Sequence, residues 1–432
     1  MTRALLAKPE SLRHELEHAL PVRPFTIRFW DGSELPSTST FTFGEDGNVD
    51  TVSANGRGRD GGESTAESGP VFTLRSPAAI AQILRAPGEL GLGRAYVTGQ
   101  LEVDDLDKVV GLMDSFQAPA LNNAARTRLA IAAIRACGLT RPPRVPAAEL
   151  RPHGRRHSRE RDARAVRHHY DVSNEFFGLF LDESMTYSCA VFSHGATTLE
   201  EAQRTKLELV CTKLRLQKGQ RVLDVGCGWG AFVIHAAREH GVKAVGITLS
   251  APQAELARAR AAEAGVADRV EIRVADYRDL AGERYDAIAS IGMVEHVGSS
   301  QIDTYARKLA ELLQPGGRLL NHGIARLRHG LPEQAGAFTQ RYVFPDGVPL
   351  QLSRVLLALE RAGFETEHVE GFRQDYYDTL SEWIARLDAH RDRAEQLVGP
   401  ERLRVWRLYL RGARDIFRRK FVSIYQVRCE LS

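Results

Sequence analysis

Residues 221 to 230 have the sequence Arg-Val-Leu-Asp-Val-Gly-Cys-Gly-Trp-Gly, and they point to the fold class. The first five residues predict a buried strand, and glycines follow at positions 226, 228 and 230. Glycines at this spacing allow a tight turn and let backbone amides approach a ligand at the start of a helix. The stretch therefore predicts a strand, a ligand-binding turn and a helix, in that order.

From residue 220 onward, short β-rich runs alternate with helical segments. This alternation is typical of a parallel sheet with crossover helices. The expected strands are Arg221 to Val225, Lys243 to Leu249, Val270 to Ala275, Tyr285 to Ile291, Gly317 to His322, Glu367 to Phe372 and Ser423 to Cys429. The clearest expected helices are Ala251 to Ala264, Gln301 to Leu313 and Leu350 to Ala362. We therefore expect an α/β fold with seven strands.

The glycine turn does not fit a nicotinamide-binding motif. Such a motif has the spacing GxGxxG, and an acid at the end of the second strand holds the ribose. Here the spacing is GxGxG, and the second strand ends Gly246-Ile-Thr-Leu-Ser250 with no acid. Asp224 before the turn and Asp276 after the third strand strengthen the prediction of a ligand site, but of another kind.

Length and composition exclude several classes of protein. A chain of 432 residues with 43% hydrophobic residues is long enough for two or three domains with a sizeable core. The formal net charge of +3 is too small to indicate a nucleic-acid partner. The five cysteines lack metal-site or disulfide spacing, so we expect no metal and a reducing cytoplasm. No apolar stretch is long enough for a signal peptide or a membrane span, so we expect a soluble or peripheral protein.

Residues 1 to 140 are expected to form a smaller N-terminal α/β accessory domain. Within it, Gly47 to Pro70 is nearly free of large apolar side chains, so we expect a flexible loop there. The other expected features are strands at Phe25 to Phe29 and Val71 to Leu74, a helix at Ala78 to Leu84 and a glycine-punctuated turn region at Leu90 to Gly99.

A basic linker is expected over residues 141 to 165, followed by a catalytic domain over residues 166 to 432. Between Arg141 and His169, nine arginines stand against three acids. One interpretation is a solvated linker between domains. The other is a patch that attracts anionic lipid head groups, with the amphipathic stretch Ala124 to Leu139 lying in the same membrane interface.

The glycine turn, the two aspartates and the strand pattern resemble the class I S-adenosylmethionine (SAM) methyltransferases. The resemblance implies a Rossmann-like, seven-stranded domain with SAM across the carboxyl ends of the first strands. The glycine backbone would lie near the methionine part of SAM. Asp276 and Tyr277 would lie near the adenine.

Further blocks narrow the resemblance to the cyclopropane-fatty-acyl-phospholipid synthases and the mycolic-acid cyclopropane synthases. The similarity covers about residues 165 to 432, and the N-terminal region resembles the accessory domain of the longer, phospholipid-acting members. The blocks are His168 to Phe177 (HHYDVSNEFF), Leu181 to Ala190 (LDESMTYSCA), Gly246 to Ser250 with Gln253, Ser290 to His296 (SIGMVEH), Leu320 to Ile324 (LNHGI), Gln340 to Pro345 (QRYVFP) and Tyr376 to Leu380 (YYDTL).

This family resemblance implies two sets of site residues. In the family a bicarbonate ion lies beside the reacting carbon, and the matching positions are Cys189 and Ile324 through their backbones, with the side chains of Glu295, His322 and Tyr376. The residues implied for SAM are Tyr187, Ser188, Asp224, Gly226, Gly228, Gly230, Thr248, Leu249, Gln253, Asp276, Tyr277 and Ile291.

The implied activity is methyl transfer from SAM to a cis double bond of an unsaturated phospholipid acyl chain at the inner face of the membrane. A cyclopropane is the expected product, and a methylene or methyl-branched product is the alternative. Two other classes stay open: a non-catalytic lipid-binding protein on this fold, and a methyltransferase for small molecules. A homo-oligomer and a reductase that acts on the product are further expectations left open.

Overall fold

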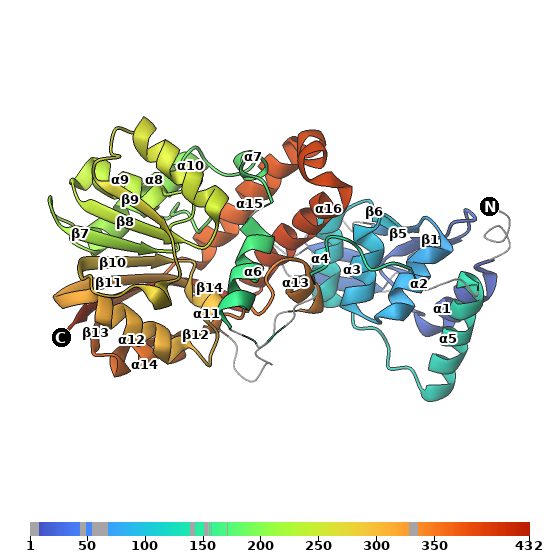
Figure 1. Cartoon of the computed structure of the whole chain (residues 1–432). Coiled ribbons are helices and arrows are strands. Elements are labelled where there is room, and N and C mark those ends of the chain that lie inside the picture. The colour runs from blue at the N-terminus through green and yellow to red at the C-terminus, as the bar shows by residue number, and fades with distance from the viewer. Residues whose placement is uncertain are drawn as a thin grey trace. The chain divides into compact units, whose positions relative to one another are not determined.

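The chain divides into two compact units in the computed structural model (Figure 1). Unit 1 comprises Met1–Glu149 and Pro400–Asp415, and unit 2 comprises Leu150–Gly399 and Ile416–Ser432. We expected the accessory domain to end at residue 140 and one catalytic domain to cover residues 166 to 432. The observed division differs because Pro400–Asp415 belongs to unit 1. The structure describes residues 8–43, 49–53, 68–138, 143–150, 154, 156, 158–170, 172–327 and 336–432.

Unit 1 is built on a four-stranded sheet with the strand order β2-β1-β5-β6. β1 is parallel to β5, whereas β1 with β2 and β5 with β6 are antiparallel. The strands are β1 (Thr26–Arg28), β2 (Glu34–Leu35), β5 (Val71–Leu74) and β6 (Leu101–Val103), with a separate hairpin of β3 (Ser39–Phe43) and β4 (Val49–Ser53). The helices are α1 (Glu10–Ala19), α2 (Pro77–Arg85), α3 (Glu89–Val97), α4 (Leu106–Ser115) and α5 (Asn123–Cys137).

Two predictions in unit 1 are wrong. The turn region expected at Leu90 to Gly99 is helix α3. A Cβ at Gly91 would lie 2.3 Å from the carbonyl oxygen of Ala86, so this glycine lets α3 pack close to the end of α2. The loop expected at Gly47 to Pro70 contains β4, which pairs with β3, and its residues 54–67 lie outside the described residues. The strand at Val71 to Leu74 and the helix at Ala78 to Leu84 are confirmed.

Unit 1 also receives part of a late helix, α16 (Arg391–Arg418). This helix is broken at Gly399, whose φ is 76°, and Pro400 follows. Beyond the break, Arg411 donates through Nε to Oδ2 of Asp107 on α4 at 3.0 Å. Residues Pro400–Asp415 therefore contact the rest of unit 1 through ion pairs and through apolar packing.

Unit 2 contains the large sheet, with the strand order β13-β14-β11-β10-β7-β8-β9. The strands from β11 to β9 are parallel to their neighbours, and β14 is antiparallel to both β11 and β13. The strand order reverses between β7 and β10, which is where α/β sheets bind ligands. The strands are β7 (Arg221–Val225), β8 (Lys243–Thr248), β9 (Val270–Val274), β10 (Tyr285–Ile291), β11 (Leu313–Arg326), β13 (Phe364–Gly371) and β14 (Val422–Leu431), with the short β12 (Leu350–Gln351) paired to β11.

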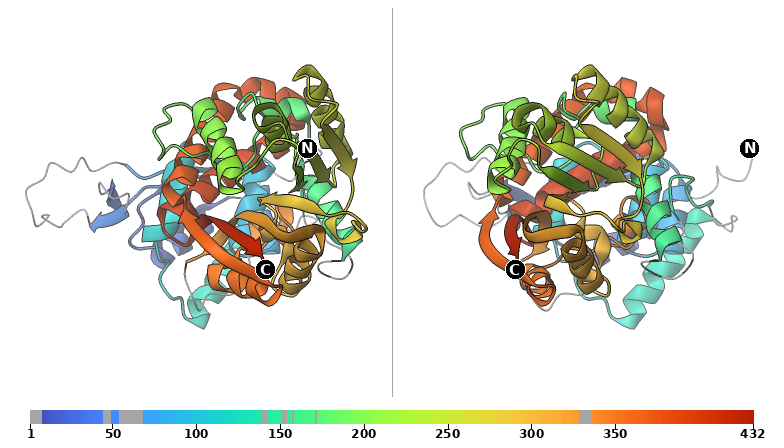
Figure 2. Two further views of the ribbon diagram at one scale, coloured as in Figure 1. Left: turned by 90° about the vertical axis from the view of Figure 1, so that its left-hand side faces the viewer. Right: turned by 60° about the vertical axis from the view of Figure 1, so that its left-hand side comes forward.

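Helices cover both faces of this sheet (Figure 2). Two buried apolar clusters hold them, one under α8, α9 and α10 and the other under α12 and α14. The unit 2 helices are α6 (Arg159–Tyr170), α7 (Asn174–Gly178), α8 (Leu199–Lys213), α9 (Ala231–His240), α10 (Ala251–Glu263), α11 (Val294–Val297), α12 (Ile302–Leu312), α13 (Ala337–Tyr342), α14 (Leu352–Arg361) and α15 (Arg373–Ala389), with a 3-10 turn at Tyr277–Asp279. The predicted α/β fold, with its seven main strands, is confirmed.

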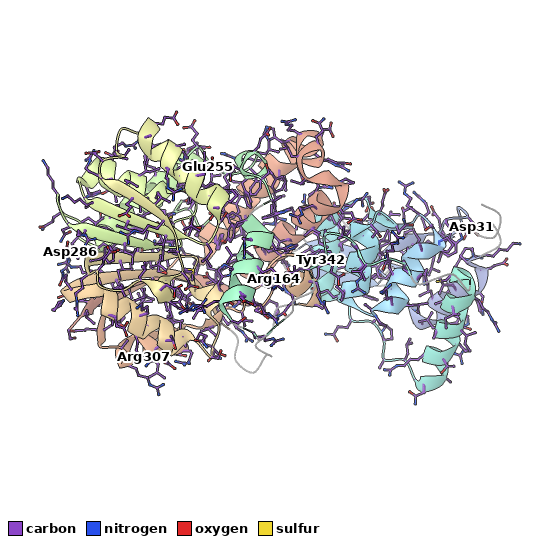
Figure 3. The ribbon with its side chains drawn as sticks, in the orientation of Figure 1. Asp31, Arg164, Glu255, Asp286, Arg307 and Tyr342 are labelled. Atoms are coloured by element: carbon purple, nitrogen blue, oxygen red, sulfur yellow. The ribbon has the colours of Figure 1, made fainter. Side chains whose placement is uncertain are left out.

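The two ends of the sheet differ in character. At the amino ends of the strands, Oδ2 of Asp286 accepts a hydrogen bond from the Arg221 amide at 2.7 Å, which ties β10 to β7 (Figure 3). The carboxyl ends of the same strands carry the glycine turn and Ile291. Ligand-binding residues are therefore expected at the second end.

The basic linker is only partly a linker. Helix α6 begins at Arg159, and Arg161 donates through Nη2 to Oδ1 of the buried Asp346 at 2.7 Å. Arg141, Arg151 and Arg155 lie outside the described residues. Among the helices that the structure describes, none has the length and apolar character needed to cross a bilayer.

Candidate active site

The glycine turn joins β7 to α9. Gly226 and Gly230 have φ values of 89° and 84°, in the left-handed region. A Cβ at Gly230 would lie 3.1 Å from the Cβ of Ala257, so α10 packs directly against the turn. The amides of Gly226 and Cys227 donate to the carbonyl oxygen of Ile247 on β8 at 3.0 and 2.9 Å. Contacts with α10 and β8 therefore fix the conformation of this turn at the start of helix α9.

A cavity lies at this turn, and it gathers nearly all the residues that the family resemblance implied for SAM. Gly230 is the exception, since it shapes the turn without lining the cavity. The predicted residues in the lining are Tyr187, Ser188, Asp224, Gly226, Gly228, Thr248, Leu249, Gln253, Asp276, Tyr277 and Ile291. They come from the loop before α8 and from the carboxyl ends of β7, β8, β9 and β10, at the point where the strand order reverses.

At the end of β8, a polar pair occupies the position where nicotinamide enzymes have an acid. The Thr248 hydroxyl donates to Oε1 of Gln253 at 2.8 Å, and both side chains are buried. The Ser250 amide donates back to the Thr248 hydroxyl at 3.2 Å. This geometry fixes an amide side chain beside the cavity, where it can bind ribose hydroxyls.

Asp276 is held by an arginine next to it. Its Oδ2 accepts from Nη2 of Arg278 at 2.6 Å, and the same guanidinium also reaches Asp162 on α6 at 3.1 Å. Burial alone would raise the pKa of Asp276, but the hydrogen bonds from Arg278 hold that pKa below its ordinary value. The neighbouring Tyr277 is buried against Tyr305 with the ring centroids 5.6 Å apart.

Sequence reasoning missed Lys206, a buried lysine in the cavity lining. Lys206 lies on α8 with 1% of its surface exposed, and its Nζ donates to the Ser188 hydroxyl at 3.1 Å. Burial lowers its pKa to about 8. Burial also raises the pKa of Asp224 to about 7, an effect that the Lys206 charge partly offsets. Ala202, Lys206 and Val210 recur at helical spacing, but only the structure shows that this face of α8 is buried.

Glu295 is the carboxyl group that the resemblance placed at the reacting carbon. It lies on α11 beyond the end of β10, and its Oε1 accepts from the Ile324 amide at 2.7 Å. Its Oε2 is buried and has no hydrogen-bond partner among the described residues. Burial raises the pKa of Glu295 to about 7.

His322 lies on β11, two residues before Ile324, and is fully buried. Its Nδ1 is 3.4 Å from Nε2 of Gln426, while Nε2 has no partner among the residues that the structure describes. Burial, with the charges of Lys206 and Lys213, lowers the pKa of His322 well below its ordinary value. The imidazole is therefore neutral, with one nitrogen directed at no described group.

Cys189 and Tyr376 meet at the first turn of α15, around Phe372. The carbonyl oxygen of Phe372 accepts from the Tyr376 amide at 3.1 Å and from the Cys189 thiol at 3.8 Å. The ring of Phe372 lies 6.2 Å from the His322 ring, centroid to centroid. Burial raises the pKa of the Cys189 thiol well above its ordinary value, so this cysteine is not a thiolate nucleophile.

The structure therefore arranges the five residues in two neighbouring groups. Glu295 pairs with Ile324, whereas Cys189, His322 and Tyr376 surround Phe372. Within the described residues, none of the five lines the cavity, but neighbours in sequence do, among them Ser188 and Met293. The five are therefore close in sequence to cavity-lining residues without being part of the lining themselves.

Aromatic rings form a contiguous cluster at one side of the cavity, which Tyr187 lines. Tyr187 stacks on Trp383 at 5.0 Å and contacts Phe177 at 5.5 Å, centroid to centroid. His169 lies 4.0 Å from Phe344 by the same measure. Such a wall excludes water and presents ring faces that stabilise cations.

Comparison with known proteins places the chain in a family. Residues 157–427 match the family model described as mycolic acid cyclopropane synthetase. A probable fatty acid methyltransferase of Mycobacterium tuberculosis is 40% identical over 86% of this chain and 88% of its own length. The cyclopropane-fatty-acyl-phospholipid synthase of Escherichia coli K12 is 32% identical over 82% of this chain and 86% of its own.

A solved structure supports the same family assignment. Mycolic acid cyclopropane synthase CmaA1, determined in complex with SAH and CTAB, superposes with a TM-score of 0.59 at 34% identity. The match covers 62% of this chain and 98% of that one. The cavity at the glycine turn, the strand order and these similarities lead to one conclusion: the chain belongs to the mycolic acid cyclopropane synthetase family and is a SAM-dependent methyltransferase.

Proposed function

We propose that this enzyme transfers a methyl carbon from SAM to a cis double bond in an unsaturated phospholipid acyl chain and closes a cyclopropane ring. The observation that carries the proposal is a pair of buried polar atoms, Oε2 of Glu295 and Nε2 of His322, which have no partners among the described residues. Met293, two residues before Glu295 in the sequence, lines the SAM cavity together with aromatic side chains such as Tyr187. A buried polar atom without a partner is costly unless a ligand satisfies it.

The residues at the glycine turn fit SAM. The Thr248 and Gln253 pair offers an amide to the ribose, and the Gly226 turn brings backbone close to the ligand. Bound SAM supplies an electrophilic methyl group on a sulfonium. The role of the chain is to hold the donor in line with the alkene, which is a weak nucleophile, and to keep water away.

The side chains of Glu295 and His322 fit a small anion such as bicarbonate. A neutral imidazole at His322 and a carboxyl at Glu295 whose pKa is about 7 can each donate or accept a hydrogen bond to such an ion. Bicarbonate, when bound, supplies an anionic base for the spare proton. The contribution of Glu295, His322 and Tyr376 is to hold and orient it without placing a mobile side chain against the lipid.

The aromatic wall is proposed to protect the cationic stage of the reaction. Methyl addition leaves a carbocation beside the new methyl group, and water there would give an alcohol. Tyr187 and Trp383 keep the region dry, and ring faces stabilise the positive charge. Loss of one proton from the transferred methyl group then lets the ring close.

A phospholipid substrate, and with it a peripheral position at a membrane surface, is supported by the extent of one similarity. The alignment with the Escherichia coli phospholipid enzyme covers 82% of the chain, more than the family match at 157–427, so it includes part of unit 1. Helix α6, in the basic segment at the start of unit 2, offers exposed arginines such as Arg164 to anionic head groups (Figure 3).

Expression in a bacterial host that lacks cyclopropane lipids, followed by proton NMR of the extracted fatty acids, tests the proposal. Upfield ring protons are the expected result. The Glu295→Gln variant in the same host is the control and should give none. Unchanged lipids in the presence of folded, SAM-binding wild-type protein would refute the proposal.

A methylene or methyl-branched product is the second candidate, because the 40% identical relative is named a fatty acid methyltransferase rather than a cyclopropane synthase. The same NMR spectrum separates the two. Vinylidene protons indicate the methylene product, which arises when a hydride shift moves the positive charge to the carbon that bears the new methyl group, and that methyl group then loses a proton.

A further inference from the structure

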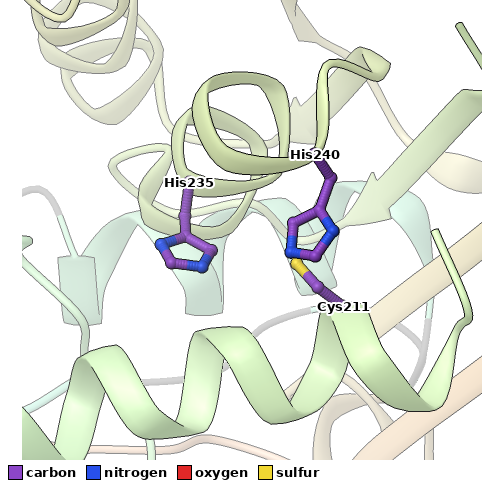
Figure 4. Close-up of side chains that lie close together, drawn as sticks. All are labelled: Cys211, His235 and His240. Atoms are coloured by element: carbon purple, nitrogen blue, oxygen red, sulfur yellow. The ribbon is translucent and has the colours of Figure 1, made fainter. Parts of the chain in front are cut away.

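Away from the cofactor cavity, a thiol and two imidazoles come together between helices α8 and α9. Cys211 projects from α8, and His235 and His240 project from α9, so that the three side chains point toward one another (Figure 4). One possible ligand atom from each lies within 4.8 Å of the other two. Cys211 and His235 are buried, and His240 is half-buried.

A carboxylate joins the same cluster. Glu208 precedes Cys211 by three residues on α8, so both side chains are on one face of that helix. Oε2 of Glu208 lies 3.2 Å from Nε2 of His235 and 3.1 Å from Nε2 of His240. Both imidazoles are therefore aimed at one point, and a fourth possible ligand lies there.

We propose that Cys211, His235, His240 and Glu208 form a binding site for a first-row transition-metal ion of the zinc class. A thiolate, two imidazoles and a carboxylate together are the donors that zinc takes in tetrahedral sites, and they are poor donors for magnesium or calcium. Bond lengths of about 2.0 to 2.3 Å place tetrahedral ligand atoms roughly 3.3 to 3.8 Å apart. The ligand atoms of Cys211, His235 and His240, which lie within 4.8 Å of one another, must therefore approach by up to about 1 Å when an ion binds. The Glu208 side chain is 49% exposed and is able to move with them.

The protonation states suit this chemistry. Burial lowers the pKa of His235, so its imidazole is neutral and able to bind a metal. Burial also raises the pKa of the Cys211 thiol, so the metal must displace a proton to bind the thiolate. Binding at neutral pH is thus expected to release a proton.

The proposed role is structural. None of the four ligands is among the residues that line the cavity, so an ion there does not reach the substrate. However, α8 also carries Lys206 in the cavity lining, and α9 begins directly after Gly230. An ion that bridges α8 and α9 would therefore clamp two helices that position the cofactor. Residue spacing alone does not indicate this site, because the four residues lie on two helices separated by strand β7.

The first experiment uses cobalt as a spectroscopic probe. The full chain is stripped of metal with a chelator and titrated with Co²⁺, and the expected result is a thiolate-to-cobalt charge-transfer band that Zn²⁺ abolishes by competition. The band should be absent in Cys211→Ala and present in Cys429→Ala, which removes another buried thiol of unit 2. No band in the wild type, or an unchanged band in Cys211→Ala, would overturn the proposal.

A milder variant covers the case in which Cys211→Ala does not fold. His240→Gln changes a half-buried side chain, and it should weaken Zn²⁺ binding at least tenfold in calorimetry and remove the rise in melting temperature that Zn²⁺ produces in the wild type. His18→Gln is the matched control, because the His18 and His14 rings of α1 lie 4.4 Å apart, centroid to centroid, and that pair can bind metals without a thiol. If His18→Gln rather than His240→Gln loses the zinc effect, the cluster is not the site.

Discussion

Glu295 on α11 accepts a hydrogen bond from the backbone amide of Ile324 on β11 at 2.7 Å, so one carboxyl oxygen is fixed by the sheet. The other oxygen is buried without a described partner. This arrangement ties the end of β10 to the strand that carries His322. It also means that a side chain next to the SAM cavity keeps one oxygen available for chemistry.

Replacing Glu295 by Gln should abolish turnover and leave SAM affinity within a few-fold of the wild type. The Gln oxygen can still accept from the Ile324 amide, so the local structure is kept while the ionisable carboxyl group is lost. Single-turnover assays with vesicles and calorimetry with SAM measure the two quantities. A large loss of SAM binding would contradict this separation of roles.

The same substitution should change how stability depends on pH. Burial raises the pKa of Glu295 from 4.5 to about 7, so the folded chain holds a proton that the unfolded chain releases. Between pH 4.5 and 7, the folding free energy of the wild type should therefore weaken as the pH rises, relative to Glu295→Gln, by about 3 kcal/mol in total. Denaturant unfolding of both proteins at a series of pH values measures the difference, and parallel curves would count against a buried, neutral carboxyl.

Lys206→Met should weaken SAM binding roughly tenfold. The Ser188 hydroxyl loses a charged hydrogen-bond partner, a loss of about 1.5 to 3 kcal/mol in typical cases, and Asp224 loses the cation that favours its ionised form. Lys213→Met is the matched control, because Lys213 is a buried lysine of the same helix that does not line the cavity. Calorimetry should show near wild-type SAM affinity for the control, and equal losses in both variants would point to helix α8 as a whole.

Arg164→Gln should reduce binding to anionic vesicles about fivefold, as expected for one basic residue at such a surface. The effect should shrink as salt is added. Arg307→Gln, an equally exposed arginine on α12, is the control (Figure 3). Co-sedimentation with anionic and neutral vesicles measures both, and a similar loss for the two variants, or for both vesicle types, would reject a head-group role for Arg164.

The strands of unit 2 were predictable because their local composition already indicates buried strands. Arg221–Val225 and Tyr285–Ile291 begin and end where they were expected. In unit 1, helix α3 was predicted to be a turn region because of its glycines, and strand β4 was predicted to be part of a loop because of its polar residues. What makes Gly91 helical is the close approach of α2, and what makes Val49–Ser53 a strand is its partner β3. Both are tertiary contacts that a local pattern does not contain.

The residues that the family resemblance implied for SAM were named from the order of the motifs, and all of them except Gly230 line one cavity. Lys206 was missed because a lysine at helical spacing is usually solvated, and its burial depends on what covers α8. The metal-site ligands were missed for a related reason. Glu208 and Cys211 are meaningful only beside His235 and His240, and the crossing of two helices brings them together.

The break at Gly399 and Pro400 has a bearing on biosynthesis. Unit 1 includes Pro400–Asp415, and Arg411 from this segment holds Asp107. A ribosome makes those residues only after Leu150–Gly399 of unit 2, so the first 149 residues wait for this helical segment until most of unit 2 has been synthesised. Gene fragments that stop at residue 149 or 399 would omit this helix, and we expect their products to be recovered poorly.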